Sequence, residues 1–318
     1  MAMGLDSLTG AAIMLLGGAI GFSTGTLNMY TTVVAQNIAE LPPYSGLGYR
    51  AFCFVVYYIV TNIFLIRYAK KVKARPELSP MYDLDQEAKA SGDAMDLEKT
   101  GILDRNKVLP LVLLVITFVV IIYGAIALKW GMSEMSALFL VYAVVADLVS
   151  GASANAMCKD LIDGSKQMLG AAYIIGMATA ISTIMNDGKI TYTIVHSLSS
   201  LLEGLPAVVI APGMVLANTV INIFLTSGSG QAVAVMPILT PLADVLGVTR
   251  QTTVLAFNFG DGFCNYVLPT STALMGTLSV TNIPYDRWMR FMWKLFLIWL
   301  IVGCILASIA QFIHLGPM

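Results

Sequence analysis

Asp261 is the first residue whose chemistry stands out, because its carboxylate lies within the apolar run Phe259-Gly-Asp-Gly-Phe-Cys-Asn265. A charged side chain is costly at membrane depth, so such an aspartate must be paired, protonated or bound to a cation. We therefore predict that Asp261, with the backbone of the flanking Gly260 and Gly262, holds a coupling ion. The alternative is a structural role as partner of a nearby donor, and Asp147 makes a weaker case of the same kind.

A second group of candidates consists of hydroxyl and amide side chains at interruptions of apolar sequence. Three of them, Ser227, Ser229 and Gln231, lie in the polar segment Thr226-Ser-Gly-Ser-Gly-Gln231. Such oxygens suit Na⁺ or a substrate, and the free N–H groups of a half-helix suit carboxylates; simple turn chemistry is the alternative. The other predicted substrate-binding residues are Asn28, Asn265, Thr270, Ser271 and Thr272. Asn218 and Asn222, one helical turn apart, are predicted to clamp the arms on either side of Ser227–Gln231.

The composition indicates that these residues lie in a membrane protein. Hydrophobic residues make up 57% of the chain, charged residues 12%, and the mean hydropathy is +0.78. A soluble domain carries about 25% charged residues, and the apolar runs here approach the roughly 20 residues that cross a bilayer as a helix. We therefore predict an all-α fold of polytopic transmembrane helices.

Three of the apolar stretches are interrupted by polar sequence. The stretch Leu8–Leu41 is broken at Gly21–Asn28, and Thr252–Thr281 is broken at Phe259–Asn265 and again at Leu268–Thr272. The similar spacing within these two broken helices predicts a repeat, which is common in carriers. Between them, 207–246 is predicted to form a re-entrant hairpin; two ordinary crossings are the alternative. Gly17, four residues before Gly21, is predicted to serve close helix packing.

The distribution of lysine and arginine predicts the orientation. If the polar segment 70–107 is cytoplasmic, 14 of the 18 basic residues lie inside and only Arg50, Lys129, Lys189 and Arg250 lie outside, as expected for a bacterial inner-membrane protein. The predicted parts are a first broken-helix repeat (1–46), a transmembrane helix (47–69), a cytoplasmic linker (70–107), scaffold-type helices with an interfacial helix at Thr191–Leu202 (108–203), a second repeat (204–282) and a final helix (283–318).

Other function classes have little support in the sequence. An intramembrane aspartyl protease needs a second carboxylate beside Asp261, and the candidate, Asp286, belongs to a cationic segment at the predicted interface. The two histidines, His196 and His314, show no metal-binding spacing, and no basic face suited to nucleic acid is present. We therefore expect no enzyme, no metal site and no nucleic-acid partner; the expected partners are the lipid bilayer and a small-molecule substrate.

Three segments carry a resemblance to a known family: Thr226–Thr252, Ala256–Gly276 (AFNFGDGFCNYVLPTSTALMG) and Thr26–Arg50. They resemble the YfcC/DcuC family of anaerobic C4-dicarboxylate carriers and basic amino acid carriers, within the ion transporter superfamily. The resemblance implies an elevator-type secondary transporter with inverted repeats, a mobile transport domain and a scaffold that forms a homodimer. It implies ion-coupled or exchange transport of small carboxylates or amino acids, with Na⁺ or H⁺ as coupling ion and no other cofactor.

Two departures from the family pattern modify these expectations. Relatives usually read Asn-Pro-Phe where this chain has Asn28-Met29-Tyr30. They also carry scaffold helices and a first re-entrant hairpin before the equivalent of Gly4, where this sequence begins. We therefore expect an N-terminally truncated chain whose missing half is encoded upstream or supplied by a second polypeptide; a non-transporting fragment or partner subunit is the alternative function.

Overall fold

The computed structural model describes residues 4–90, 105–128, 130, 132–190, 193, 196–197, 200 and 207–316. Every regular element among these residues is helical, which confirms the predicted all-α fold. Four described segments are long and apolar enough to cross a membrane: Ser7–Ile38, Leu47–Ala74, Gly228–Leu246 and Tyr285–Phe312. The chain divides into two compact units, one formed by residues 3–91 with 170–318 and the other by residues 92–169.

Two long helices of the first unit, α3 (Leu47–Ala74) and α13 (Tyr285–Phe312), carry apolar side chains on their exposed faces as well as on their buried ones. On the outer face of α3, Phe52 is 52% exposed, and on that of α13, Ile301 is 61% exposed. On the inner face, the buried Trp299 donates its indole N–H to Thr61 Oγ1 at 2.9 Å. An apolar outer surface, with a buried polar group such as the Trp299 indole N–H hydrogen-bonded on the inside, suits a lipid environment.

The first broken helix is confirmed. Helix α1 (Ser7–Thr24) ends at Gly25, whose φ of 63° is left-handed, and the chain resumes at Met29 as a short π-helix (η1, Met29–Val33) that continues into α2 (Val34–Ile38). Glycine reaches this backbone conformation without steric cost, which explains why the helix ends there. Gly17 behaves differently from our expectation: an added Cβ would have no described atom within 4 Å, so the predicted close packing is wrong.

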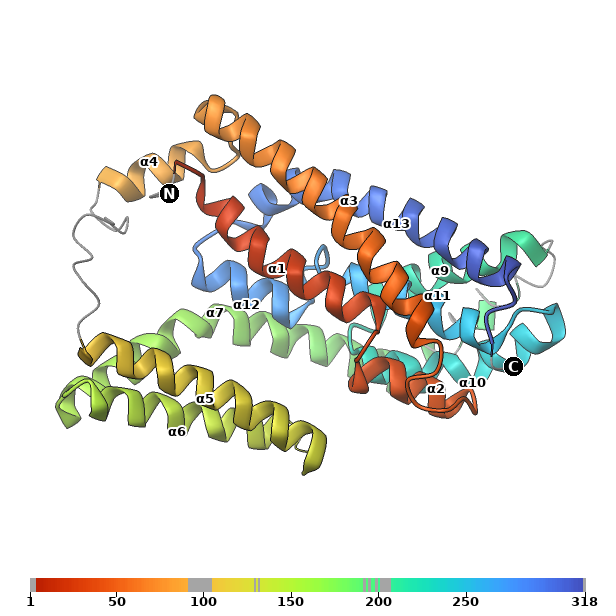
Figure 1. Ribbon diagram of the computed structural model, residues 1–318, viewed down its shortest axis with the longest axis horizontal. Helices are drawn as coiled ribbons and strands as arrows, with labels where there is room; N and C mark the ends of the chain where they lie inside the picture. The colour runs from red at the N-terminus through yellow and green to blue at the C-terminus, as the bar shows by residue number, and fades with distance from the viewer. Residues whose placement is uncertain are drawn as a thin grey trace. The chain divides into compact units, whose positions relative to one another are not determined.

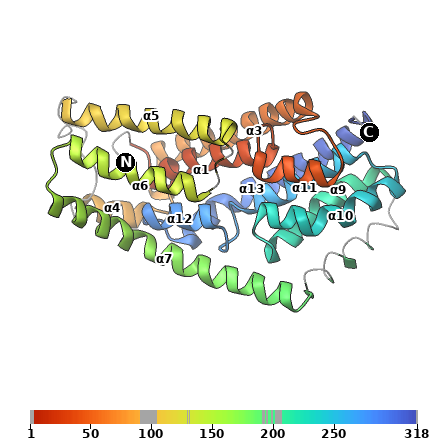
Figure 2. The ribbon, with the colours of Figure 1, turned by 90° about the horizontal axis from the view of Figure 1, so that it is seen from below.

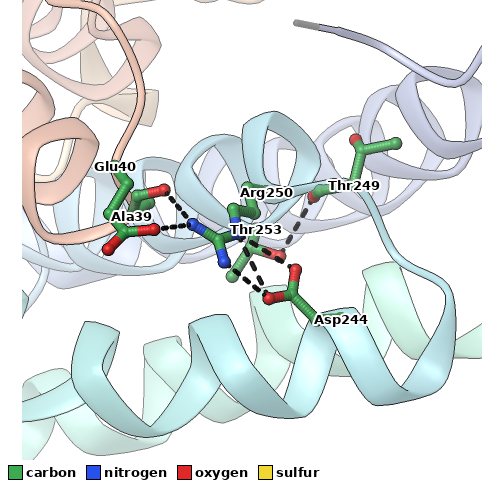
Figure 3. Close-up of polar contacts among 6 residues, drawn as sticks. All are labelled: Ala39, Glu40, Asp244, Thr249, Arg250 and Thr253. Carbon is green, nitrogen blue, oxygen red and sulfur yellow. Dashed lines mark hydrogen bonds and ion pairs between the residues drawn. The ribbon is translucent and has the colours of Figure 1, made fainter. Parts of the chain in front are cut away.

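The predicted hairpin is present as two helices, α9 (Ala207–Phe224) and α10 (Gly228–Leu246). The turn between them is shorter than the sequence suggested, because α10 already begins at Gly228, with the Ser227 hydroxyl capping it by accepting from the Gly230 amide. At the far end of α10, Arg250 donates to both carboxylate oxygens of Asp244 and to the Ala39 carbonyl after α2 (Figure 3). The depth of the turn within the membrane stays a prediction.

The buried centre of the first unit is α11 (Arg250–Cys264), in which every residue from Gln251 onward is buried. It packs against α1, α9, α10 and α13, and lies beside α9 and α10 in both Figure 1 and Figure 2. Our prediction that the helix unwinds at Phe259–Asn265 is wrong. The helix continues to Cys264, and residues 265–271 are non-helical before α12 (Thr272–Val280). The interruption that we also predicted at Leu268–Thr272 is therefore confirmed up to Ser271. The glycines in this run allow neighbouring helices to approach rather than making a turn.

The segment predicted as a polar linker is folded over much of its length. Helix α3 extends to Ala74, and η2 (Pro76–Leu78) and α4 (Tyr82–Ala90) follow. Buried hydrogen bonds fasten this segment, since the Asp6 carboxylate accepts from the Tyr68 and Ser79 hydroxyls at 2.6 Å each. Residues 91–104 of the predicted linker lie outside the described residues, and its last three residues, 105–107, already belong to the next helix.

The second unit contains α5 (Arg105–Ala127), α6 (Met132–Val149) and the beginning of α7 (Ala154–Asp187). Helices α5 and α6 lie side by side in both ribbon views, with Phe118 and Phe139 in edge-to-face contact at 6.3 Å between ring centroids. Of the predicted interfacial helix Thr191–Leu202, most residues fall outside the described part of the chain.

Candidate functional site

Polar groups from three parts of the first unit meet beside α11. They come from the break between α1 and η1, from the turn between α9 and α10, and from α11 itself. The turn is pressed against the other two: a Cβ added at Gly228 would lie 2.9 Å from Asp261 Oδ2 and 2.5 Å from Thr31 Cγ2. Thr32 Oγ1, just after the break, donates to Asn258 Oδ1 of α11 at 3.2 Å. Residues far apart in the sequence therefore form one polar cluster.

The centre of this cluster is Asp261, whose side chain is fully buried. Its Oδ1 accepts a hydrogen bond from Asn222 Nδ2 at 2.7 Å. Its Oδ2 is also buried and has no hydrogen-bond partner among the described residues. A buried carboxylate oxygen without a donor carries a full desolvation cost, so the site favours a proton or a cation at Asp261.

Gln231 connects the two arms of the hairpin to this carboxylate. Its Oε1 accepts from Asn222 Nδ2 at 2.8 Å, and its Nε2 donates to the backbone carbonyl of Asn218 at 3.1 Å. All three side chains are fully buried. The prediction that Asn218 and Asn222 clamp the arms is confirmed, and Gln231 completes the clamp. Because Asn222 bonds both Gln231 and Asp261, the conformation of the turn is coupled to the carboxylate.

Gly260 and Gly262 determine how closely α11 can be approached. An added Cβ at Gly260 would lie 2.7 Å from the Val215 carbonyl oxygen of α9, and one at Gly262 would lie 2.6 Å from Ser23 Cα of α1. Both glycines are in regular helix. The helix is therefore not unwound at these positions, and the close approach of two neighbouring helices accounts for glycine at both. A role of their backbone in holding a coupling ion stays a prediction.

Asn28 and Asn265 each stabilise the end of a helix. Asn28 Oδ1 accepts from the amides of Tyr30 and Thr31 at 3.0 and 3.1 Å, and its Nδ2 donates to the Phe22 carbonyl at 3.2 Å. Asn265 Nδ2 donates to the backbone carbonyl of Asp261 at 3.0 Å. Both asparagines are part of the backbone scaffolding that surrounds the cluster.

The predicted substrate-binding residues with hydroxyl groups differ in their exposure and in their hydrogen bonds. Ser227 and Ser229 are exposed at the start of α10. Ser271 caps α12, Thr272 is exposed at its first residue, and Thr270 Oγ1 is buried without a hydrogen-bond partner. No hydrogen bond among the described residues joins the segment 270–272 to Asp261. The structure therefore brings together Asp261, Gln231, Asn265 and the two glycines, but does not link the 270–272 hydroxyls to them.

The sequence analysis missed Arg50. This residue of α3 was counted only as a basic residue on the non-cytoplasmic side, yet its side chain is only 1% exposed, and its Nη1 donates to Asn258 Oδ1 at 2.7 Å. An arginine near the end of an apolar helix ordinarily indicates an interface, so only the contact with a residue 208 positions away reveals its burial. Asn258, one helical turn before Asp261, was also missed, because only its contacts with Arg50 and Thr32, which are distant in the sequence, reveal its role.

The two other aspartates considered above have different surroundings. Asp286 is 62% exposed in its side chain and lies 3.7 Å and 3.8 Å from the guanidinium groups of Arg287 and Arg290, so its environment is that of a surface ion pair. Asp147 belongs to the second unit, where it lines a cavity of about 810 Å³ between α6 and the start of α7. Neither residue makes a hydrogen bond to the Asp261 cluster among those described.

Comparison with known proteins gives one consistent result. The model of the DcuC family, described as C4-dicarboxylate anaerobic carrier, matches residues 1–312. A protein of Escherichia coli K12 named "Putative basic amino acid antiporter YfcC" is 34% identical over 301 residues, which cover 91% of this chain and 58% of that protein. An uncharacterized protein of Haemophilus influenzae is 30% identical over 307 residues, covering 96% and 60%. The chain thus spans about 60% of the length of these relatives. No solved structure matches significantly.

Proposed function

The chain belongs to the C4-dicarboxylate anaerobic carrier family, and we propose that it functions in ion-coupled or exchange transport of small carboxylates or amino acids. The family description names a dicarboxylate and the Escherichia coli relative is named for basic amino acids, so both classes of solute are candidates. Both names describe membrane transport rather than catalysis. The proposed location is the cell membrane, with the segment 70–107 on the cytoplasmic side.

The observation that carries the proposal is the fully buried Oδ2 of Asp261, which has no hydrogen-bond partner in the described part of the chain. A residue with only a structural role would be expected to have both carboxylate oxygens satisfied. Asp261 Oδ2 needs a cation or a proton, and it lies next to the turn that bears the exposed Ser227 and Ser229. This combination suits a site that binds a coupling ion. In this proposal Asp261 receives the coupling ion, and Gly260 and Gly262 position it through the packing of α11.

The predicted substrate-binding side chains surround this centre in the proposal. Ser227 and Ser229 are exposed at the turn and are available to a solute. Gln231 is buried and would contribute indirectly, because its hydrogen bond with Asn222 holds α9 and α10 together. Asn28 and Asn265 maintain the adjacent helix ends. The hydroxyls of Thr270, Ser271 and Thr272 would contribute after movement of the chain, because no hydrogen bond of the described structure connects them to Asp261.

Gradient-driven uptake by proteoliposomes tests the proposal. The purified protein would be given radiolabelled succinate or L-arginine under an imposed Na⁺ or proton gradient, or with the same solute inside for exchange. We expect Asp261→Asn to reduce gradient-driven uptake by about tenfold or more. Asp286→Asn is the matched control, since this carboxylate is 62% exposed, and it should transport as the wild type does. Equal gradient-driven uptake by the Asp261 variant and the wild type would contradict the coupling role.

A further inference from the structure

Arg50 is a buried cation without a matching anion. Its side chain is 1% exposed, and its Nη1 donates to the neutral side chain of Asn258 at 2.7 Å. Its Nη2 is buried, and among the described residues it has neither a hydrogen-bond partner nor a carboxylate that forms an ion pair with it. A guanidinium presents a planar fork of donors that matches a carboxylate, and here part of that fork is unused.

The surroundings of Arg50 do not supply the missing acceptor. A Cβ added at Gly25 would lie 2.9 Å from Arg50 Nη1 and 3.0 Å from Asn258 Oδ1, so the break after α1 packs directly on this pair. Asn258 Oδ1 already accepts from both Arg50 and Thr32. The carboxyl end of α1 contributes a partial negative charge nearby, but no carbonyl of the described residues accepts a hydrogen bond from Nη2. Leaving a buried charge incompletely paired is destabilising, which favours an external anion.

Arg50 also lies next to the proposed coupling site. Asn258 precedes Asp261 by three residues on α11, so their side chains are neighbours on one helix face. Asn258 Nδ2 donates to Thr31 Oγ1 at 3.4 Å, and Thr31 faces the turn at Gly228. Arg50 and Asp261 therefore lie on either side of Asn258, Thr31 and the turn at Gly228, although no hydrogen bond among the described residues connects the two charged groups directly.

We propose that Arg50 binds the carboxylate group of the transported solute, with Nη2 and Nη1 as the donors. This inference rests on the proposed transport function, and it assigns recognition of the anionic group to a residue outside the hairpin. Because Arg50 is closed off in this conformation, a solute reaches it only when the segment around Gly25 and Thr32 or the adjacent turn moves.

Binding measurements with matched probes test the inference. The purified protein would be titrated in detergent with succinate, with L-arginine and with agmatine, which is arginine without its carboxylate. We expect Arg50→Gln to weaken binding of the wild type's preferred carboxylate by about tenfold or more and to leave agmatine binding unchanged. The control is Arg67→Gln, which removes the same charge from an exposed position of the same helix and should bind normally.

A second variant guards against misfolding of the first. Asn258→Asp places a carboxylate of the same shape beside Arg50, so the variant should keep the fold. The new carboxylate would form an ion pair with the guanidinium and compete with the carboxylate of the solute. It too should weaken carboxylate binding. Unchanged affinity in well-folded Asn258→Asp, or in well-folded Arg50→Gln, overturns the role of Arg50 while leaving transport intact. If the wild type neither binds nor transports a carboxylate, the proposed function fails as well.

Discussion

Replacing Gly260 by alanine should destabilise the protein, because α9 occupies the space that a side chain would need. An added Cβ would lie 2.5 Å from Asn218 Cβ, 2.7 Å from the Val215 carbonyl oxygen and 2.8 Å from the Thr219 amide nitrogen. To restore ordinary van der Waals contact, α9 and α11 would have to separate by about 0.6–0.9 Å. Overpacking of an interior costs about 1–3 kcal/mol. We expect the upper half of this range, since two of the three atoms belong to backbone that cannot turn aside.

The assay is thermal unfolding of the purified protein in detergent, followed by size-exclusion chromatography of the fraction that remains folded. For a chain of this size, 1 kcal/mol corresponds to about 2 °C, so the midpoint should fall by about 4–6 °C. Gly17→Ala is the matched control because it is the same substitution in a helix, at a position with no described atom within 4 Å of the added Cβ. Alanine is favoured over glycine in a helix by about 0.5–1 kcal/mol, so this control should not be destabilised. Equal midpoints for the two variants would refute the close contact of α9 and α11.

Two further predictions concern contacts that hold the cluster in place. Gln231→Ala leaves the buried Asn218 Oδ1 without its donor and should lower the free energy of unfolding by about 1–3 kcal/mol, measured by the same thermal assay; an unchanged midpoint would show that the clamp contributes nothing. Arg250→Gln removes the contacts with Asp244, Glu40 and the Ala39 carbonyl (Figure 3) and should cost about 1 kcal/mol, because the ion pairs are partly exposed. That loss should shrink in high salt, and a loss independent of salt would contradict an electrostatic origin.

The elements with strong local signals could be predicted from the sequence. The first break was predicted because Gly, Ser and Thr interrupt an apolar run, and Gly25 ends α1 in a left-handed conformation. In the second broken helix, the interruption predicted at Leu268–Thr272 agrees with the structure, whereas the one predicted at Phe259–Asn265 does not, because a Gly-Asp-Gly run also suggests a turn. The same glycines also suit close helix packing. Only the positions of α9 and α1, which no local pattern specifies, decide between these two uses.

The candidate site shows the same division between local and long-range information. Asp261 could be identified because a carboxylate in an apolar run is costly whatever surrounds it. Arg50 could not, because an arginine at the end of a membrane helix normally reaches the interface. Its burial depends on Asn258, 208 residues away, and on the conformation of Gly25. Sequence reasoning therefore found the residue whose local sequence is unusual and missed the one whose local sequence is ordinary.

The glycines around Asp261 explain how its carboxylate can be buried against both α9 and the turn at Gly228. Gly260 lets α9 approach closely enough for Asn222 to bond Oδ1, and Gly228 lets the turn approach Oδ2 without offering it a donor. A side chain at either glycine would hold these elements apart. A cation or proton at Oδ2 would offset the cost of the unpaired oxygen, and it would do so most strongly while the turn excludes water. We infer that occupation of Asp261 and closure of the turn stabilise each other, which is the coupling that an ion-driven carrier needs.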